Sequence, residues 1–412
     1  MVHFKTLDNG VRLVVNTMEG LMSVSIGILV GTGACVETEE ENGISHFIEH
    51  MMFKGTKKRT AFQISDEMDR IGAQVNAFTG KDLTCYYAKS ITENAPQAFE
   101  ILADFFLNST FPQHEMVREK GVVIEEINMT EDTPDDLCLD LIGEAYYGQT
   151  GYGRNILGTP ENVNGFTKKN IKDYIAKRYT ADNIVIAMAG NIDVSAAEDL
   201  AEKYFGNLSS SSAQKREVST ECKHQSLIRN KDIEQVHIAL AYPSVCRGDK
   251  NSEAAQIMNS VLGGSMSSRL FQTVREKLGL AYTVYSYLSP YNGTGALTIY
   301  AGVNAQNYKK SVDAVYKCIN ELKKDNVTKE EFERGKEQMK ASFIYSQEST
   351  SSQMLLYGKE LIYNDRLFNF SDKIEKINSV TLDDIAEVIS LNFDERYKAA
   401  AVVGKLDEPL EL

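Results

Sequence analysis

The chain has 412 residues, 42% apolar and 25% charged, a globular composition in a chain too long for a single ordinary core. A formal net charge of −14 argues against a nucleic-acid-binding protein, because such proteins present a basic face. The six cysteines include no C-x-x-C pair, which argues against a disulfide framework or a cysteine zinc site and favours reduced thiols.

The N-terminal segment, MVHFKTLDNG, lacks the basic and apolar regions of a signal peptide, and no stretch of 18 apolar residues follows. We therefore expect a cytoplasmic protein without membrane insertion. Residues 4–15 are predicted to form a hairpin with a two-residue turn at Asn9-Gly10, and residues 24–30 a buried strand. The acidic residues that follow, from Glu37 to Glu41, are interpreted as solvated surface.

A helix predicted over residues 44–53, with Ser45 as its N-cap, carries the sequence His46-Phe47-Ile48-Glu49-His50. Residues three and four apart share a helix face, so both imidazoles and the carboxylate can point to one site. A zinc hydrolase needs protein ligands, an open position for water and a carboxylate base. The order H-x-x-E-H is the inverted zincin signature. We predict two metal ligands and a base here; the alternative is a surface helix with two chance histidines.

Residues 60–71 are predicted to be helical, residues 74–78 and 83–88 to be strands, and residues 94–107 to be helical. The next predicted helix, 115–130, is the expected source of a third ligand.

Four residues of this helix share one face, namely Glu119, Val122, Val123 and Glu126. Carboxylates beside an apolar stripe are rarely buried unless they are paired or bind a metal. We choose Glu126 as the third ligand and Glu119 as the residue that orients a ligand or the water, because Glu125 falls on a more polar face. The alternative is an acidic, solvated helix.

The motif, its flanking sequence ISHFIEHMMFKGTKKRT and the distal glutamate resemble the pitrilysin/insulinase family of inverted zincin peptidases, in its mitochondrial-processing-peptidase-like branch. The similarity covers essentially the whole chain. It implies one zinc ion per chain on His46, His50 and Glu126, and Glu49 as the general base. A family glutamate seven residues before the metal-binding glutamate matches Glu119.

The same resemblance implies that the strand QVNAFT, residues 74–79, is an exposed edge that holds the substrate backbone, so Asn76, Ala77 and Phe78 become candidate substrate-binding residues. Strand addition at such an edge uses main-chain hydrogen bonds, which ignore side-chain sequence. The alternative is an internal hairpin strand with no free edge.

A polar segment, 209–221, is predicted to be a linker between two domains, 1–208 and 222–412. We expect an α+β fold of two tandem homologous domains. Each is expected to be a mostly antiparallel sheet packed with helices.

The evidence for the duplication is that the pattern of the first half restarts after the linker. Residues 235–242 and 295–301 repeat the strands 24–30 and 83–88. The second domain is expected to lack metal, because its counterpart of the motif helix carries Met258 and Asn259 in place of histidines.

The second domain has its own distinctive segment, residues 263–287. A hydrolase needs a donor for the tetrahedral oxyanion, and Arg and Tyr both donate hydrogen bonds. In the family that this chain resembles, an Arg and a Tyr seven residues later contact substrate and assist turnover. The resemblance therefore implies these roles for Arg275 and Tyr282, with Arg269 as an alternative. The alternative is that Arg275 makes a surface ion pair and that Tyr282 fills the core.

We therefore predict a zinc-dependent endopeptidase that cleaves peptides or unfolded, presequence-like segments, in which Glu49 activates zinc-bound water. Larger family members form a clamshell of four such domains, so the resemblance implies half a clamshell and a homodimer with an enclosed chamber; a heterodimer is possible. A non-catalytic or partner-dependent subunit is one alternative. A facial triad for non-haem iron is another, although an oxygenase has no need of a carboxylate beside the water.

Overall fold

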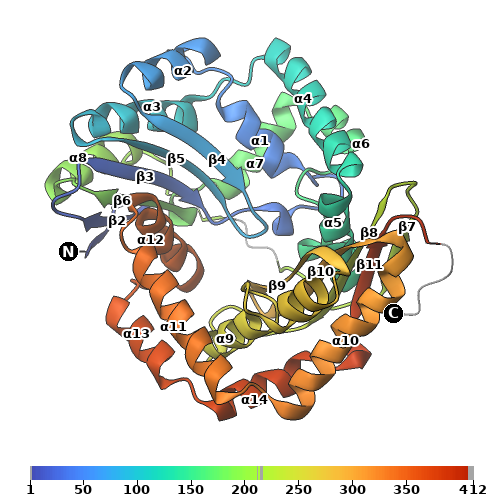
Figure 1. Ribbon diagram of the computed structural model, residues 1–412. Coiled ribbons are helices and arrows are strands. Elements are labelled where there is room, and N and C mark those ends of the chain that lie inside the picture. The colour runs from blue at the N-terminus through green and yellow to red at the C-terminus, as the bar shows by residue number, and fades with distance from the viewer. Residues whose placement is uncertain (1, 211, 214–216, 407–412) are drawn as a thin grey trace. The chain divides into compact units, whose positions relative to one another are not determined.

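The computed structural model describes residues 2–210, 212–213 and 217–406, which form two compact units (Figure 1). The first unit comprises Met1–Ile127, Asn155–Val218 and Ile344–Phe368, and the second comprises Asn128–Arg154, Ser219–Phe343 and Asn369–Leu412. Each unit thus takes a segment from the other half of the chain, which the contiguous domains predicted from the sequence do not include. Residues 211 and 214–216 of the predicted linker lie outside the described residues.

The first unit is built on a six-stranded sheet in the order β1-β2-β6-β3-β5-β4. Its strands are β1 Val2–Thr6, β2 Arg12–Thr17, β3 Ser23–Val30, β4 Gln74–Thr79, β5 Thr84–Ile91 and β6 Ile184–Gly190. β2 and β6 are parallel, and the other neighbouring strands are antiparallel. β3 and β6 are buried almost throughout, which explains their near-continuous apolar sequences.

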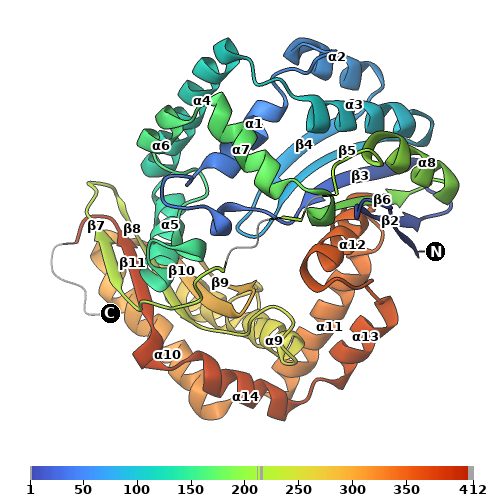
Figure 2. The same cartoon turned by 180° about the vertical axis from the view of Figure 1, so that it is seen from behind.

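The helices of the first unit are α1 Ile44–Met52, α2 Ala61–Arg70, α3 Ala95–Asn108, α4 Gln113–Asp132 as far as Ile127, α6 Pro160–Gly165, α7 Lys168–Arg178, α8 Val194–Phe205 and α12 Thr350–Asn364. Most of them contribute to one core with the sheet, in which Phe47, Phe105 and Phe205 are fully buried. α12 instead lies against β3 and β6 with Met354 and Leu361 in a separate cluster (Figures 1 and 2).

The first hairpin has a three-residue loop, so the prediction of a two-residue turn at Asn9-Gly10 was wrong. Leu7 N–H donates to the Val11 carbonyl at 2.8 Å, and Gly10 has φ 101°. This is the longer hairpin loop that places glycine in the left-handed region. Asn9 lies at the loop centre, where its side-chain amide donates to the carbonyl of Phe205 at 2.7 Å.

The second unit repeats the topology of the first. Its sheet has the order β7-β11-β8-β10-β9, with β7 and β11 parallel and the other neighbours antiparallel. The strands are β7 Ser226–Arg229, β8 Gln235–Pro243, β9 Ala281–Tyr291, β10 Thr294–Asn304 and β11 Ala399–Val403. This matches β2-β6-β3-β5-β4 in order and direction, so the predicted α+β fold with two similar halves is confirmed.

The helices of the second unit are α5 Pro134–Tyr147, α9 Ser252–Leu262, a π-helix at Phe271–Lys277, α10 Tyr308–Asp325, α11 Lys329–Ser346 as far as Phe343, α13 Phe370–Ser379 and α14 Leu382–Asn392. α5 packs on β8 and β11, the strands that correspond to β3 and β6 under α12. The two exchanged helices therefore cover equivalent strands of the two sheets. No helix among the described residues is long and apolar enough to cross a membrane.

Candidate metal centre

The N-terminus of α1 is capped by a buried carboxylate from outside the helix, so the prediction of Ser45 as N-cap was wrong. Gly43 occupies that position with φ 94°, and a Cβ there would lie 2.5 Å from the Leu157 carbonyl oxygen. Glu37, 0% exposed, accepts from Gly43 N–H at 2.8 Å, Ser45 N–H at 2.9 Å and the Asn42 side chain at 3.2 Å. Glu37 thus satisfies amides that the helix itself leaves unpaired.

Glu37→Gln is expected to destabilise the fold by about 1–3 kcal/mol, because the side-chain NH2 group cannot accept from a helix amide. Burial raises the pKa of Glu37 to about 7, above the ordinary 4.5. The contribution of Glu37 is therefore complete below about pH 4.5 and declines as the pH rises through 7. Thermal unfolding should show a larger loss in the variant at acidic than at alkaline pH. Exposed Glu39→Gln is the control, and an equal loss there would contradict this role.

The side chains of His46, His50 and Glu126 converge, and they form the candidate metal-binding group found among the described residues. His46 Nε2 and His50 Nε2 lie 3.6 and 3.5 Å from Glu126 Oε2. These distances are too long for good hydrogen bonds. Ligands about 2.05 Å from a tetrahedral zinc ion lie about 3.3 Å apart, so the spacing fits a shared ion. Two imidazoles and one carboxylate are a common donor set of catalytic zinc sites.

The buried and exposed faces of α4 are the ones predicted from the sequence, with one exception. Glu119 and Val123 are buried, Glu126 is half-buried and Glu125 is exposed. Val122 was predicted on the buried face but is 47% exposed, because the buried stripe of α4 runs through Met116, Glu119, Val123 and Ile127 and leaves Val122 at its edge.

The two histidines have different electrostatic environments. Burial, followed by the neighbouring His50, lowers the pKa of His46 to about 3, so its imidazole is neutral and available as a ligand. Burial also lowers the pKa of His50, but the hydrogen bond and charge of Glu119, together with the charges of Glu126 and Glu49, outweigh it and raise that pKa overall. His46 Nδ1 is buried without a hydrogen-bond partner in the described part of the chain.

Glu119 holds His50, in the position predicted for a residue that orients a ligand. Its Oε1 lies 2.9 Å from His50 Nδ1, and Lys54 Nζ lies 2.6 Å from its Oε2. An acceptor at Nδ1 fixes the tautomer that leaves Nε2 free for a metal. Lys54 was not recognised in the sequence, although it follows His50 by four residues, a helical spacing.

Glu49 lies on the same helix between the two histidines. Burial raises the pKa of its carboxyl group. The Thr79 hydroxyl donates to Glu49 Oε2 at 2.5 Å and holds the carboxylate in place. Thr79 is the last residue of β4 and another contact that the sequence did not indicate. The arrangement suits a proton acceptor fixed beside the ligands.

The candidate substrate strand is at the edge of its sheet. In the described residues β4 pairs with β5 alone, which excludes the internal-strand alternative. Asn76 is exposed, whereas Ala77 and Phe78 are half-buried. The Asn76 side-chain oxygen accepts from the Ala77 N–H at 2.8 Å. Their contact with substrate stays a prediction.

Arg275 and Tyr282 lie together in the second unit. The Arg275 guanidinium sits 4.7 Å from the ring centre of Phe271 and 5.2 Å from that of Tyr282. Tyr282 is 76% exposed, so it does not fill a core. The guanidinium of the alternative residue, Arg269, instead donates hydrogen bonds of 2.8 and 2.7 Å to the Glu331 carboxylate. The roles of Arg275 and Tyr282 in turnover stay predictions.

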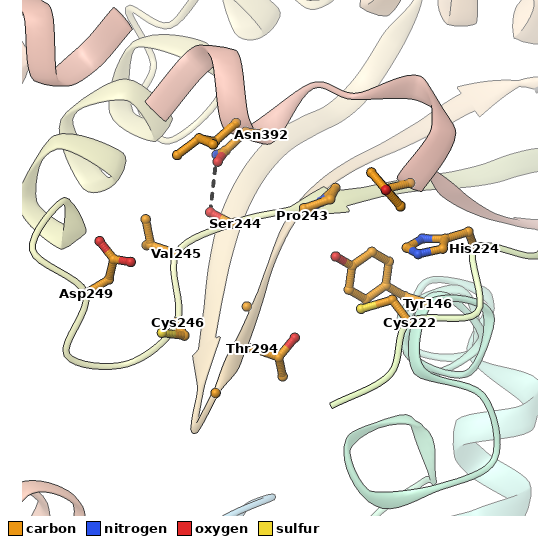
Figure 3. A pocket seen from close by; sticks show the side chains of 14 residues that line it. Tyr146, Cys222, His224, Pro243, Ser244, Val245, Cys246, Asp249, Thr294 and Asn392 are labelled. Atoms are coloured by element: carbon orange, nitrogen blue, oxygen red, sulfur yellow. Dashed lines mark hydrogen bonds between the residues drawn. The ribbon is translucent and has the colours of Figure 1, made fainter. Parts of the chain in front are cut away.

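A separate pocket of about 520 Å³ lies in the second unit (Figure 3). Two half-buried free cysteines, Cys222 and Cys246, line it, and Asn392 donates to the Ser244 hydroxyl at 3.2 Å on its wall. None of the predicted site residues is among the described residues that line this pocket.

Comparisons with known proteins find related sequences for both halves of the chain. Residues 13–160 match the model of the insulinase family, peptidase family M16, and residues 165–339 match that of the peptidase M16 inactive domain. The uncharacterized zinc protease YmxG of Bacillus subtilis is 42% identical over 402 residues and 98% of each chain. The uncharacterized zinc protease SCO5738 of Streptomyces coelicolor is 34% identical, over 98% of this chain and 89% of its own.

Solved structures share the fold. The peptidase M16 inactive domain from Pseudomonas fluorescens has a TM-score of 0.92 and 21% identity, with 100% of both chains covered. A protease from Helicobacter pylori has a TM-score of 0.89 and 23% identity, over 98% of this chain and 99% of that one.

Proposed function

Since the chain belongs to the insulinase (M16) family of peptidases, we propose that it is a zinc-dependent endopeptidase acting on peptides and unfolded segments. The observation that carries the proposal is the convergence of His46 and His50 on Glu126, beside the half-buried Glu49. The names of the relatives support zinc as the metal.

In this proposal the metal-binding group holds one zinc ion, which when bound acts as a Lewis acid and lowers the pKa of water toward about 7. Glu49 accepts a proton from the attacking water and delivers it to the leaving amine. The raised pKa of Glu49 favours its acceptance of the proton, and the hydrogen bond from the Thr79 hydroxyl fixes the orientation of the carboxylate. Glu119 keeps His50 in the ligating tautomer.

The edge of β4 supports extended peptides as substrates. Gly80 N–H bonds the Leu83 carbonyl at 2.8 Å, so Gly80 and Leu83 form a hydrogen-bonded pair. Such pairs alternate along an antiparallel ladder, which turns the main-chain groups of Val75, Ala77 and Thr79 outward. A substrate strand would bond these groups and replace the Asn76 side chain at the Ala77 amide.

The test compares wild type with Glu49→Gln, with zinc content and cleavage of an unfolded peptide measured on the same preparations. Zinc in both with cleavage in the wild type alone supports the proposal. Zinc without cleavage in either would favour a partner-dependent or non-catalytic subunit. Iron in place of zinc would favour the facial-triad alternative.

We also propose a homodimer in which the second unit of one protomer faces the metal centre of the other, so that Arg275 and Tyr282 complete the partner's site. Exposure of Tyr282, with the guanidinium of Arg275 over its ring, supports a role outside the core. A closed dimer of this kind has two equivalent sites.

Mixing Arg275→Ala chains with Glu49→Gln chains is expected to recover about a quarter of wild-type cleavage after subunits exchange, because half of the dimers are mixed and each has one intact site. Cleavage is measured before and after exchange. A mixture of Glu49→Gln with His46→Ala is the control and should recover nothing. Recovery no greater than the mean of the two separate variants would contradict shared sites.

A further inference from the structure

We infer that Lys54 is a positioning residue of the metal centre, acting on His50 through Glu119. This inference rests on the proposed function, since it concerns how tightly the site holds zinc. Lys54 touches none of the three ligands in the contacts described above; its ammonium bonds Glu119, and Glu119 bonds His50.

The contacts of Glu119 leave little freedom to its carboxylate. It is 3% exposed, with one oxygen 2.6 Å from Lys54 Nζ and the other 2.9 Å from His50 Nδ1. A buried charge that loses one partner moves, recruits water or becomes neutral. Any of these outcomes weakens the acceptor that fixes the orientation of the His50 ring.

The backbone around Lys54 is itself fixed, so the ammonium is delivered to a defined place. Ser109 Oγ donates to the Met52 carbonyl at 2.8 Å, and Thr110 N–H donates to the Gly55 carbonyl at 3.0 Å. Gly55 has φ 117°, a conformation that favours glycine. These contacts tie the end of α1 to the residues that follow α3.

A purely electrostatic role for Lys54 would change the zinc affinity in the opposite direction from a positioning role. A positive charge near a cation site repels the metal, so its removal would strengthen zinc binding. A positioning role predicts weaker binding, because the orientation of His50 is lost. The sign of the change in zinc affinity therefore separates the two roles without any measurement of catalysis.

The test is the dissociation constant of zinc, measured by chelator competition for wild type, Lys54→Met, Lys54→Gln and Lys54→Arg. The two neutral variants are expected to bind zinc about 10–100-fold more weakly, and Lys54→Arg, which retains the charge, to recover most of the affinity. The control is Lys57→Met, an exposed lysine on the same segment. Lys54→Gln keeps a polar group and serves where Lys54→Met fails to fold.

Unchanged or tighter zinc binding in both neutral variants would overturn the inference and leave the proposed function standing. A wild type that binds no zinc would overturn both, so the two failures are distinguishable. The absorption spectrum of the cobalt(II)-substituted protein gives a second readout. A displaced His50 changes the coordination geometry, whereas a defect elsewhere in the fold leaves it unaltered.

Discussion

Glu49→Gln is expected to lower the cleavage of an unfolded peptide by about 10²–10⁴-fold, because the amide cannot accept the proton of the attacking water. Zinc content is expected to stay at the wild-type level, since Glu49 is not one of the three converging ligands. The measurement is kcat/KM with zinc content determined on the same samples.

Two features make this substitution informative. Glutamine has nearly the shape of glutamate and can still accept from Thr79 through its oxygen, so the helix and the ligand positions should persist. Zinc retention is therefore an internal control for folding. Undiminished cleavage with zinc present would remove Glu49 from the chemistry, and loss of zinc along with cleavage would show that Glu49 supports the metal site instead.

The three residues of the candidate metal-binding group could be selected from the sequence because the selection depends on helical spacing. His46 and His50 are one turn apart, and the face of α4 selected Glu126 over the adjacent Glu125. Periodicity states which residues of one helix share a face, but not where two helices cross. The meeting of α1 and α4 at this point therefore required the family resemblance or the structure.

Glu119 was predicted, but three other supporting residues were not, because each of them lies outside the two helices that carry the candidate ligands. Glu37 belongs to an acidic run interpreted as solvated surface, yet it is buried at the N-terminus of α1. Thr79 lies at the end of a strand, and Lys54 in the turn after α1. The sequence does not indicate the partner of a charged or hydroxyl side chain when that partner belongs to another element, as Glu119 does for Lys54.

The exchange of α5 and α12 between the units was missed for a related reason. Each helix has an apolar face, but the sequence does not state which sheet that face covers. β3 and β6 are apolar on both faces and require a second layer, which α12 provides from the other half of the chain. The π-helix at Phe271–Lys277 was also unforeseen, since its period differs from those of regular helices and strands.

The duplicated unit shows what the shared fold supplies and what it does not. α9 follows β8 as α1 follows β3, but its Met258 is fully buried and its Asn259 oxygen accepts from the Ser286 hydroxyl at 2.7 Å. The corresponding helix is thus used for packing and a local hydrogen bond. The fold provides a helix at this place in both units, and only the first unit adds the candidate ligands of α1 and α4 to it among the described residues.

The largest effect on metal binding is expected for Glu126→Gln, which replaces a charged ligand with a neutral amide. Zinc affinity should fall by more than about 100-fold, beyond the range typical of residues that only orient a ligand, and cleavage should fall with it. Glu125→Gln is the matched control, because it removes the adjacent, exposed carboxylate from the same helix. Zinc affinity of both variants is measured by chelator competition. Equal losses in the two would mean that the charge of α4 governs binding, whereas loss in Glu126→Gln alone identifies the third ligand.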